Sequence, residues 1–179
     1  MASKVWFITG CSSGFGAALT QEILSRGDEV IATARNASRI SDLQNVGAKI
    51  MELDVTADAT TLKSKAEEAY NIFGRIDFLI NNAGFSLQGT VEELTAEEIQ
   101  TQFDTNVFGM LNVTRAFLPY LRKQRSGVIG NISSIGAWRG VAGLGVYCSS
   151  KSMFGFDDSF SLVRHGPGRE GGGLFPPGC

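Results

Sequence analysis

A tyrosine and a lysine one helical turn apart are the first residues of this sequence that could do chemistry. In the stretch "VYCSSKSMFGF", Tyr147 precedes Lys151 by four residues, so a helix would place both side chains on one face. A phenol titrates near pH ~10, which makes it a poor acid or base at neutrality. A cation one turn away stabilises the phenolate and lowers that pKa. The pair therefore predicts a tuned acid/base, with an ordinary surface pair on a helix as the alternative.

A glycine-rich loop near the start of the chain predicts a phosphate-binding site. It reads "TGCSSGFG", and its characteristic residues are Thr9, Gly10, Gly14 and Gly16. Gly10 would allow a tight turn, Gly14 a close approach of the backbone to a pyrophosphate, and Gly16 close packing of a helix on the sheet. The N-terminus of that helix would present free N–H groups to the phosphates. The alternative is a glycine-rich turn that binds nothing.

The residue after the second β-rich run bears on the choice of dinucleotide. In dinucleotide-binding folds this position, roughly 20 residues beyond the glycine loop, meets the adenosine ribose, and an acid there binds the 2′-hydroxyl of NAD. Here the chain reads "TARN", so Ala34 is followed by Arg35 and not by a carboxylate. A guanidinium suits a 2′-phosphate. The sequence thus favours NADP over NAD, with a solvated surface cation as the alternative for Arg35.

Composition excludes several classes of function. The 179 residues favour one domain, and 43% hydrophobic with 19% charged residues suit a globular core. A net charge of −2 gives no sign of a nucleic-acid surface. Three widely spaced cysteines predict neither a disulfide framework nor a metal site, and the only histidine, His165, is expected to have no catalytic role. No apolar run suits a signal peptide or a membrane span, so we expect a soluble, cytoplasmic protein.

Short apolar runs alternate with longer amphipathic segments, and together they would position these side chains. A short helix capped by Thr95 and Glu98 and another carrying Tyr147 are expected. Apolar strands alternating with helices predict an α/β fold, a doubly wound (Rossmann) parallel sheet of five strands. The expected strands are 4–9, 29–34, 48–55, 76–80 and 127–133, and the other expected helices are 15–27, 58–73 and 101–124.

From about residue 3 to about residue 160, the chain resembles the short-chain dehydrogenase/reductase family. "TGCSSGFG" is similar to the family's cofactor loop, "NNAG" at 81–84 to its cofactor-lining motif, and the Tyr/Lys pair to its Y-x-x-x-K motif. The resemblance implies an oxidoreductase that uses NADP, or less readily NAD. The implied catalytic residues are Asn106 in "NVFG", Ser134 in "NISS", Tyr147 and Lys151. The implied cofactor-binding residues are Thr9, Gly10, Ser12, Ser13, Gly14, Phe15, Gly16, Arg35, Asp54, Val55, Asn82, Ala83, Gly84, Tyr147 and Lys151.

The resemblance also implies a mechanism, hydride transfer between the nicotinamide and a carbonyl or alcohol carbon of a small molecule. Tyr147 would exchange a proton with the substrate oxygen, while Lys151 would lower the tyrosine pKa and hold the nicotinamide ribose. Ser134 would hydrogen-bond the substrate oxygen. Asn106 would hold a water that connects Lys151 to solvent. One departure weakens the NADP prediction, because many NADP-using members carry a basic residue where this chain has Ser13.

The end of the chain does not resemble the family. The composition becomes rich in glycine and proline, so we expect one domain over 1–162 and a disordered tail over 163–179. The family has two further strands and a substrate loop, and the sheet is expected to lack them, as a frame shift or an altered splice would produce. The fifth strand would then be an exposed edge. Homo-oligomers are usual in the family and doubtful here.

Two alternative functions stay open. The first is a cofactor-binding domain with little or no turnover, either a truncated product or a binding regulator. Because its fifth strand would be an exposed edge, the isolated chain is expected to bind cofactor weakly at best, to have little activity and to aggregate. The second, more remote, is a methyltransferase with a related nucleotide fold, against which the NNAG and Y-x-x-x-K motifs argue. Phe85, Trp138 and Arg139 lie beside the motifs and are candidates for the substrate mouth, or ordinary packing and surface residues. The sequence names no substrate.

Overall fold

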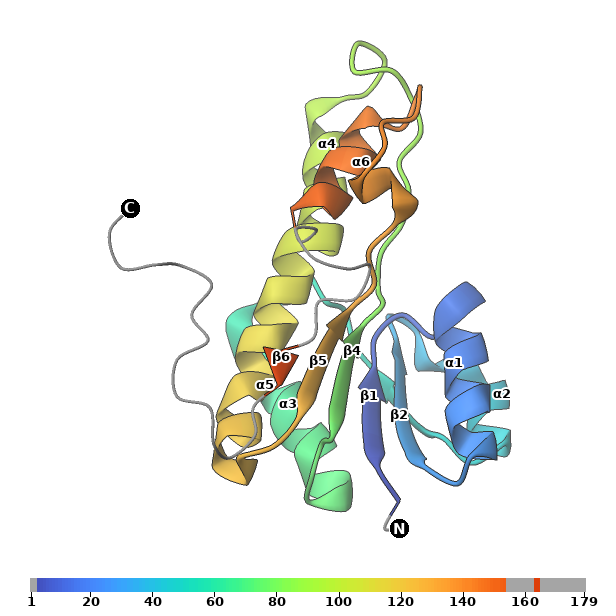
Figure 1. The fold of residues 1–179 in the computed structure, drawn as a ribbon, viewed down its shortest axis with the longest axis vertical. Coiled ribbons are helices and arrows are strands. Elements are labelled where there is room, and N and C mark those ends of the chain that lie inside the picture. Colours follow the sequence, from blue (N-terminus) through green and yellow to red (C-terminus); the bar gives the residue numbers. More distant parts are fainter. Residues whose placement is uncertain (1–2, 154–162, 165–179) are drawn as a thin grey trace.

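Five short apolar runs form parallel strands, as the sequence predicted. The computed structural model describes residues 3–153 and 163–164. The strands lie side by side in the order β3-β2-β1-β4-β5 (Figure 1). One strand has the predicted bounds, and the others differ by one to three residues at their ends. The bounds are β1 Val5–Ile8, β2 Glu29–Ala34, β3 Lys49–Glu52, β4 Phe78–Asn81 and β5 Val128–Asn131.

A two-residue strand adds to the outer edge of β5. This strand, β6 (Val163–Arg164), runs antiparallel to β5, with Val163 opposite Ile129. The sequence predicted a free edge on the fifth strand, whereas two residues of the expected tail pair with that edge in the structure. An edge strand offers unpaired N–H and C=O groups that a further segment can bind. Residues 154–162 and 165–179, with His165 and the rest of the expected tail, lie outside the described residues.

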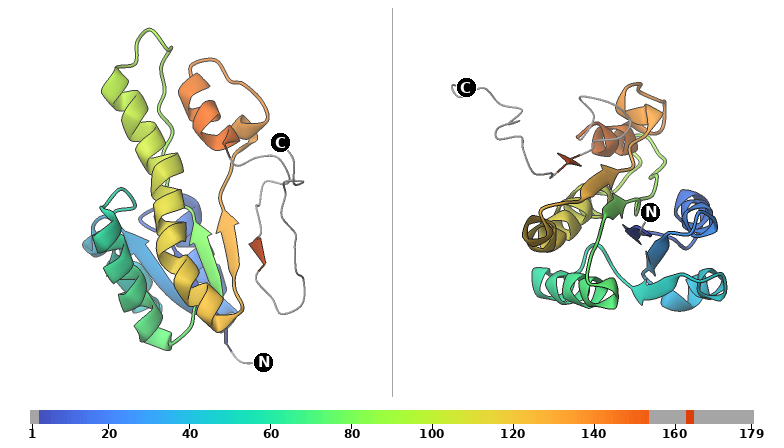
Figure 2. Two further views of the ribbon diagram at one scale, coloured as in Figure 1. Left: turned by 90° about the vertical axis from the view of Figure 1, so that its left-hand side faces the viewer. Right: turned by 60° about the horizontal axis from the view of Figure 1, so that its bottom comes forward.

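Helices cover both faces of the sheet because side chains along a strand point alternately to each face. On one face, Ile8 and Ile80 belong to a core that includes Ile23. On the other face, Phe7 packs on Phe117 with ring centroids 4.4 Å apart. The two layers are visible in Figure 2. The first layer holds α1 (Gly14–Ser25), a 3-10 turn (Ala37–Ile40) and α2 (Ser41–Asn45), and the second holds α3 (Ala59–Phe73) and α5 (Met110–Gln124).

One long helical segment crosses from the sheet to the region above it. The helix α4 (Ala96–Phe103) continues through a π-helical stretch, Asp104–Gly109, into α5. Figure 2 shows this segment as a single rod. The sequence correctly predicted the capping box of Thr95 and Glu98 but separated the short capped helix from the long one. A π-helical stretch inside an α-helix often occurs at a functional site, and this one carries Asn106.

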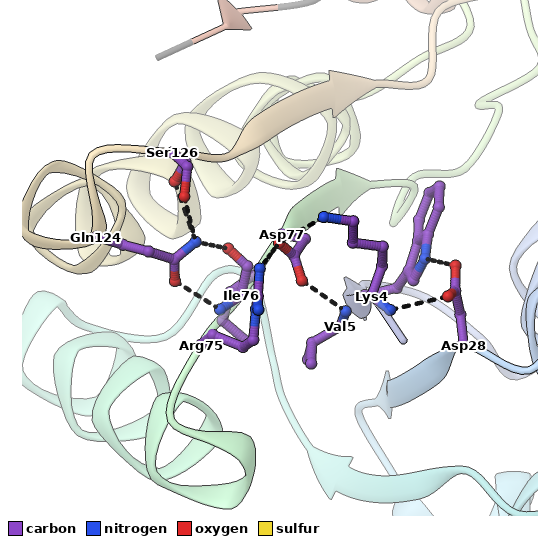
Figure 3. A network of polar contacts seen from close by, with 9 residues as sticks. Lys4, Val5, Asp28, Arg75, Ile76, Asp77, Gln124 and Ser126 are labelled. Atoms are coloured by element: carbon purple, nitrogen blue, oxygen red, sulfur yellow. Dashed lines mark hydrogen bonds and ion pairs between the residues drawn. The ribbon is translucent and has the colours of Figure 1, made fainter. Parts of the chain in front are cut away.

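A polar network fastens the amino ends of β1 and β4 (Figure 3). The buried Asp77 carboxylate accepts the Val5 N–H at 2.9 Å and pairs with Arg75. Asp28 accepts the Lys4 N–H at 2.8 Å. The Gln124 amide binds both the N–H and the carbonyl of Ile76. These bonds hold the end of the sheet at which the strands begin. Ligands of open α/β sheets bind at the other end, outside the carboxyl ends of the strands.

The region beyond the carboxyl ends of the strands holds α4 and α6 (Gly145–Ser152), as Figure 1 shows. A 3-10 turn, Ile135–Ala137, leads from β5 toward α6. Within residues 3–153 and 163–164, no helix is long and apolar enough to cross a membrane. The same residues contain no cluster of three or more His, Cys, Asp and Glu side chains that could hold a metal ion.

Candidate active site

The glycine loop is fastened to the end of β4 by a threonine and an asparagine. Thr9 is buried, and its Oγ1 accepts the N–H groups of Asn82 at 3.0 Å and Ala83 at 2.9 Å. In return, the Asn82 Nδ2 donates to the carbonyls of Thr9 and Gly10, both at 2.9 Å. The loop after β1 and the NNAG segment after β4 therefore form one fixed unit. It lies where the strand order reverses, the usual ligand crevice of such sheets.

Two glycines of the loop are required by close contacts. Gly10 has a φ of +71°, and a Cβ there would lie 2.7 Å from the Ala83 Cα. At Gly16, a Cβ would lie 2.5 Å from the Gly10 carbonyl oxygen and 2.6 Å from the Asn82 Nδ2. The close contacts at Gly16 thus come from the glycine loop and the NNAG segment. From the sequence, Gly16 was expected to allow a helix to pack closely on the sheet. These contacts let the loop lie close to β4.

The third glycine faces open space at the start of α1. No atom of the described residues lies within 4 Å of a Cβ built on Gly14, and its φ is +57°. Ser13 is the N-cap of α1, but its side chain caps no N–H, and the first turn carries no acidic residue. Ser12, Ser13 and Phe15 are exposed beside it. The N–H groups of the first turn are thus available to a phosphate, which the positive end of the helix dipole would also attract.

A cleft of about 300 Å³ opens beside the loop, at the carboxyl ends of β2 and β3. Arg35 is exposed at this cleft, directly after β2. Asp54 also lines it, and its Oδ1 accepts the N–H of Thr56 at 2.9 Å and the Thr56 hydroxyl at 2.7 Å. Val55 is buried next to it. The remaining described residues of the wall are Gly10, Leu53, Thr56, Ala83, Gly84, Phe85, Thr101, Asp104 and Thr105.

A second cleft, of about 420 Å³, brings together three of the four residues expected to be catalytic. Ser134, Tyr147 and Lys151 line it together, although Ser134 follows β5 and the other two lie on α6. The Lys151 Nζ donates to the Ile132 carbonyl at 2.9 Å, and burial lowers the pKa of this lysine. The other described residues of the wall are Phe15, Asn82, Gly84, Phe85, Ser86, Ile132 and Ser133.

The fourth residue, Asn106, lies behind the cleft wall. Its side chain is 3% exposed, and its Oδ1 accepts the N–H of Phe85 at 3.0 Å. Its Nδ2 donates to the Phe85 carbonyl at 2.9 Å and to the Ser150 Oγ at 3.1 Å. The Ser150 hydroxyl donates in turn to the Tyr147 carbonyl at 2.7 Å. Asn106 therefore connects the segment after β4 to the helix that carries Tyr147.

A small cavity lies between Asn106 and Lys151. Its volume is about 10 Å³, close to the ~10–15 Å³ that one water molecule needs. Ser133 and Ser150 also line it. The Ser133 Oγ is buried, and no hydrogen-bond partner for it occurs among the described residues. The cavity is thus polar enough to hold a water molecule.

Two buried polar residues near the clefts were not predicted from the sequence. Ser150 was not singled out, although it lies between the tyrosine and the lysine and bonds the asparagine. Gln102 is fully buried one turn before Asn106, and only that spacing could have pointed to it. Of the three residues suggested for the substrate mouth, Phe85 lines both clefts. Trp138 and Arg139 are exposed, and neither is among the described residues that line them.

Known sequences resemble this chain over most of its length. The family model for short chain dehydrogenases matches residues 4–157. The chain is 40% identical over 165 residues to Oxidoreductase BOA17 of Botryotinia fuckeliana, and 38% identical over 167 residues to the 3-ketodihydrosphingosine reductase of Bacteroides thetaiotaomicron. These alignments cover 90% and 92% of this chain but 59% and 60% of those proteins.

Solved structures give the same result. A short-chain dehydrogenase from Streptomyces avermitilis matches with a TM-score of 0.80 at 39% identity, over 85% of this chain and 57% of that one. An alcohol dehydrogenase from the archaeon Thermococcus sibiricus, solved in complex with 5-hydroxy-NADP, matches with a TM-score of 0.77 at 27% identity, over 84% of this chain and 66% of that one. The fold, the order of the motifs and the family model agree, and the chain belongs to the short chain dehydrogenase family.

Proposed function

We propose that this chain carries the dinucleotide site and the catalytic side chains of an NADP(H)-dependent oxidoreductase that interconverts a carbonyl and an alcohol. The observation that carries the proposal is the meeting of Ser134, Tyr147 and Lys151 in one cleft beside the glycine loop. A phenol and a hydroxyl around one space can polarise a carbonyl oxygen, and the phenol can move one proton. The ammonium group beside them favours the negative charge that forms when the phenol gives up its proton.

The residues present fit a dinucleotide. Open space at Gly14 and the free N–H groups at the start of α1 suit a pyrophosphate. The two clefts share Gly84 and Phe85 in their walls, and each also borders the glycine loop, the first at Gly10 and the second at Phe15. Asp54 and Val55 would then meet the adenosine end, while Lys151 would meet the nicotinamide ribose. When bound, the dinucleotide supplies or accepts the hydride.

A preference for NADP(H) is supported by the charges around the first cleft. Arg35 is exposed where the adenosine ribose would lie, and no acidic residue follows β2 directly. An arginine can bind a 2′-phosphate with two hydrogen bonds. Ser13 adds no charge, so the preference would rest mainly on Arg35.

Side chains of this chain would bind the substrate oxygen, transfer the proton and hold the site in place. In reduction, the Tyr147 hydroxyl would donate its proton to the substrate oxygen, and the Ser134 hydroxyl would hydrogen-bond the same oxygen. The Ile132 carbonyl holds Lys151 in place. The Asn106 amide already binds Phe85 and Ser150, so its side chain would position the wall and α6. The small cavity beside it would hold the water that connects Lys151 to solvent.

The decisive experiment measures binding first and turnover second. NADPH should raise the melting temperature of the chain more than NADH does at equal concentration, because a ligand stabilises the state that binds it. A panel of aldehydes and ketones then tests oxidation of NADPH by its loss of absorbance. Binding without turnover would favour the alternative of a cofactor-binding domain. If neither NADPH nor NADH raises the melting temperature, the proposed function as a whole is wrong.

A further inference from the structure

A short segment without regular secondary structure separates the two clefts. It runs from Gly84 to Leu87, directly after the NNAG motif. Phe85 lines both clefts, and Ser86 lines the cleft of Tyr147. Among the described residues, neither a helix nor a sheet supplies hydrogen bonds to this backbone, so its polar groups depend on side chains or on water. The segment therefore forms a wall between the clefts, and the hydrogen bonds to its backbone fix the position of that wall.

Gln102 supplies two of those bonds. Its side chain is fully buried, with 0% of its surface exposed. The Nε2 donates to the Phe85 carbonyl at 2.8 Å, and the Oε1 accepts the Leu87 N–H at 2.7 Å. Asn106, one turn further along the same helical segment, binds the same Phe85 carbonyl and also the Phe85 N–H. Two amides thus form four hydrogen bonds to three backbone groups of the segment.

We propose that Gln102 is a positioning residue of the dinucleotide site, which sets the wall between the two clefts by fixing the backbone of Phe85 and Leu87. The inference rests on the proposed function, because a wall matters only if a dinucleotide passes along it. Both bonds of Gln102 go to the Gly84–Leu87 segment, one of them to Phe85, which lines both clefts. Asn106 binds only Phe85 within the wall, so Leu87 depends on Gln102 among the described residues.

The two halves of a dinucleotide should respond differently to loss of Gln102. The glycine loop is held by Thr9 and Asn82, and Arg35 follows β2, so these contacts do not pass through Gln102. The nicotinamide half would lie against Phe85 and Ser86 in the second cleft. A displaced wall should therefore weaken binding of the whole dinucleotide more than binding of its adenosine half.

The test compares Gln102→Met, which keeps the length of the side chain but forms neither bond, with Gln100→Met as the matched control. Gln100 is exposed on the same helix, and its amide binds Asp104. Calorimetry should show NADPH binding weakened by ~10-fold in the Gln102 variant, equivalent to about 1.4 kcal/mol. Binding of 2′,5′-ADP should change by less than about threefold on the same scale.

Hydrogen exchange of the chain without ligand provides a second, independent readout. The amides of Phe85 and Leu87 should exchange faster in Gln102→Met than in Gln100→Met, at temperatures where both variants are folded by circular dichroism. Unchanged exchange would overturn the inference, as would equal weakening of NADPH and 2′,5′-ADP, which marks a general loss of structure. If the unsubstituted chain does not bind NADPH, the proposed function fails before any variant is compared. The exchange arm then still decides whether Gln102 holds the wall.

Discussion

Thr9 and Asn82 bind each other in both directions across the ends of β1 and β4. The threonine Oγ1 accepts the asparagine N–H at 3.0 Å, and the asparagine Nδ2 donates to the threonine carbonyl at 2.9 Å. Thr9 is 1% exposed, so both bonds form away from solvent. This reciprocal pair explains why the loop motif and the NNAG motif occur together. Each holds the other in the shape that leaves the start of α1 open to a ligand.

Replacing Thr9 by valine tests this pair, because valine keeps the shape and removes the hydroxyl. The Ala83 N–H would lose its acceptor, while the Asn82 N–H would keep the Ile80 carbonyl at 3.1 Å. A buried polar group left without a partner costs about 1–3 kcal/mol. We expect the free energy of unfolding in urea to fall by about that amount. Thr60→Val, at an exposed position on α3, is the control and should change it by less than about 0.5 kcal/mol. Equal stabilities of the two variants would contradict the role of the hydroxyl.

Replacing Arg35 by alanine tests the cofactor preference. Loss of a charge-assisted bond to the 2′-phosphate should weaken NADPH binding about 10- to 100-fold and leave NADH binding almost unchanged. Arg115→Ala, which removes the same charge from an exposed position on α5, is the matched control. Dissociation constants from fluorescence titration would decide the matter. Equal affinities for NADPH and NADH in the unsubstituted chain would show that Arg35 does not select the cofactor.

Replacing Tyr147 by phenylalanine separates binding from proton transfer. The ring remains in the cleft while the only proton that it can exchange is lost, so NADPH binding should persist. Turnover, once detected in the unsubstituted chain, should fall about 10²- to 10⁴-fold, the usual contribution of a positioned acid or base. Tyr120→Phe is the control, since Tyr120 packs against Tyr70 between α3 and α5. A Tyr147 variant that keeps most of its kcat would assign the proton to another group.

The sequence was sufficient to predict the parallel sheet, because hydrophobic runs and glycine turns are local signals. The meeting of the motifs at one edge follows from the same pattern, since parallel strands bring their carboxyl ends together. The capping box at Thr95 is equally local and was found. What the pattern could not predict was the continuous segment through residues 104–109, because a π-helical stretch has no periodicity distinct from that of its neighbours.

Contacts between distant residues were the other part that could not be predicted. Gln102 and Ser150 are buried polar groups whose partners are backbone atoms or residues far away in the chain. A polar residue within a helix reads as solvent-facing unless its partner is known. The position of Asn106 behind the wall was missed for the same reason, although its motif marked it as important. The pairing of Val163 with Ile129 depends on a free strand edge and not on any local pattern.

The charge of Lys151 gives a prediction for the dependence of stability on pH. Burial lowers the pKa of this lysine in the folded chain, and its ordinary value is near ~10.4. Below the lowered pKa the lysine is charged in both states, so the full cost of burying the charge opposes folding. As the pH rises from the lowered pKa to the ordinary value, the folded state releases its proton first and that cost disappears. Folding should therefore become more favourable across this window because of Lys151.

A Lys151→Met variant isolates this effect, since methionine does not titrate. The difference in free energy of unfolding between the unsubstituted chain and the variant should be flat near neutrality. It should then shift in favour of the unsubstituted chain as the pH rises toward ~10.4. Lys63→Met, at an exposed position on α3, is the control, because it removes one lysine far from the cleft. The free energies of unfolding are measured with urea at a series of pH values. If the difference between the unsubstituted chain and Lys151→Met does not change with pH, the prediction is wrong.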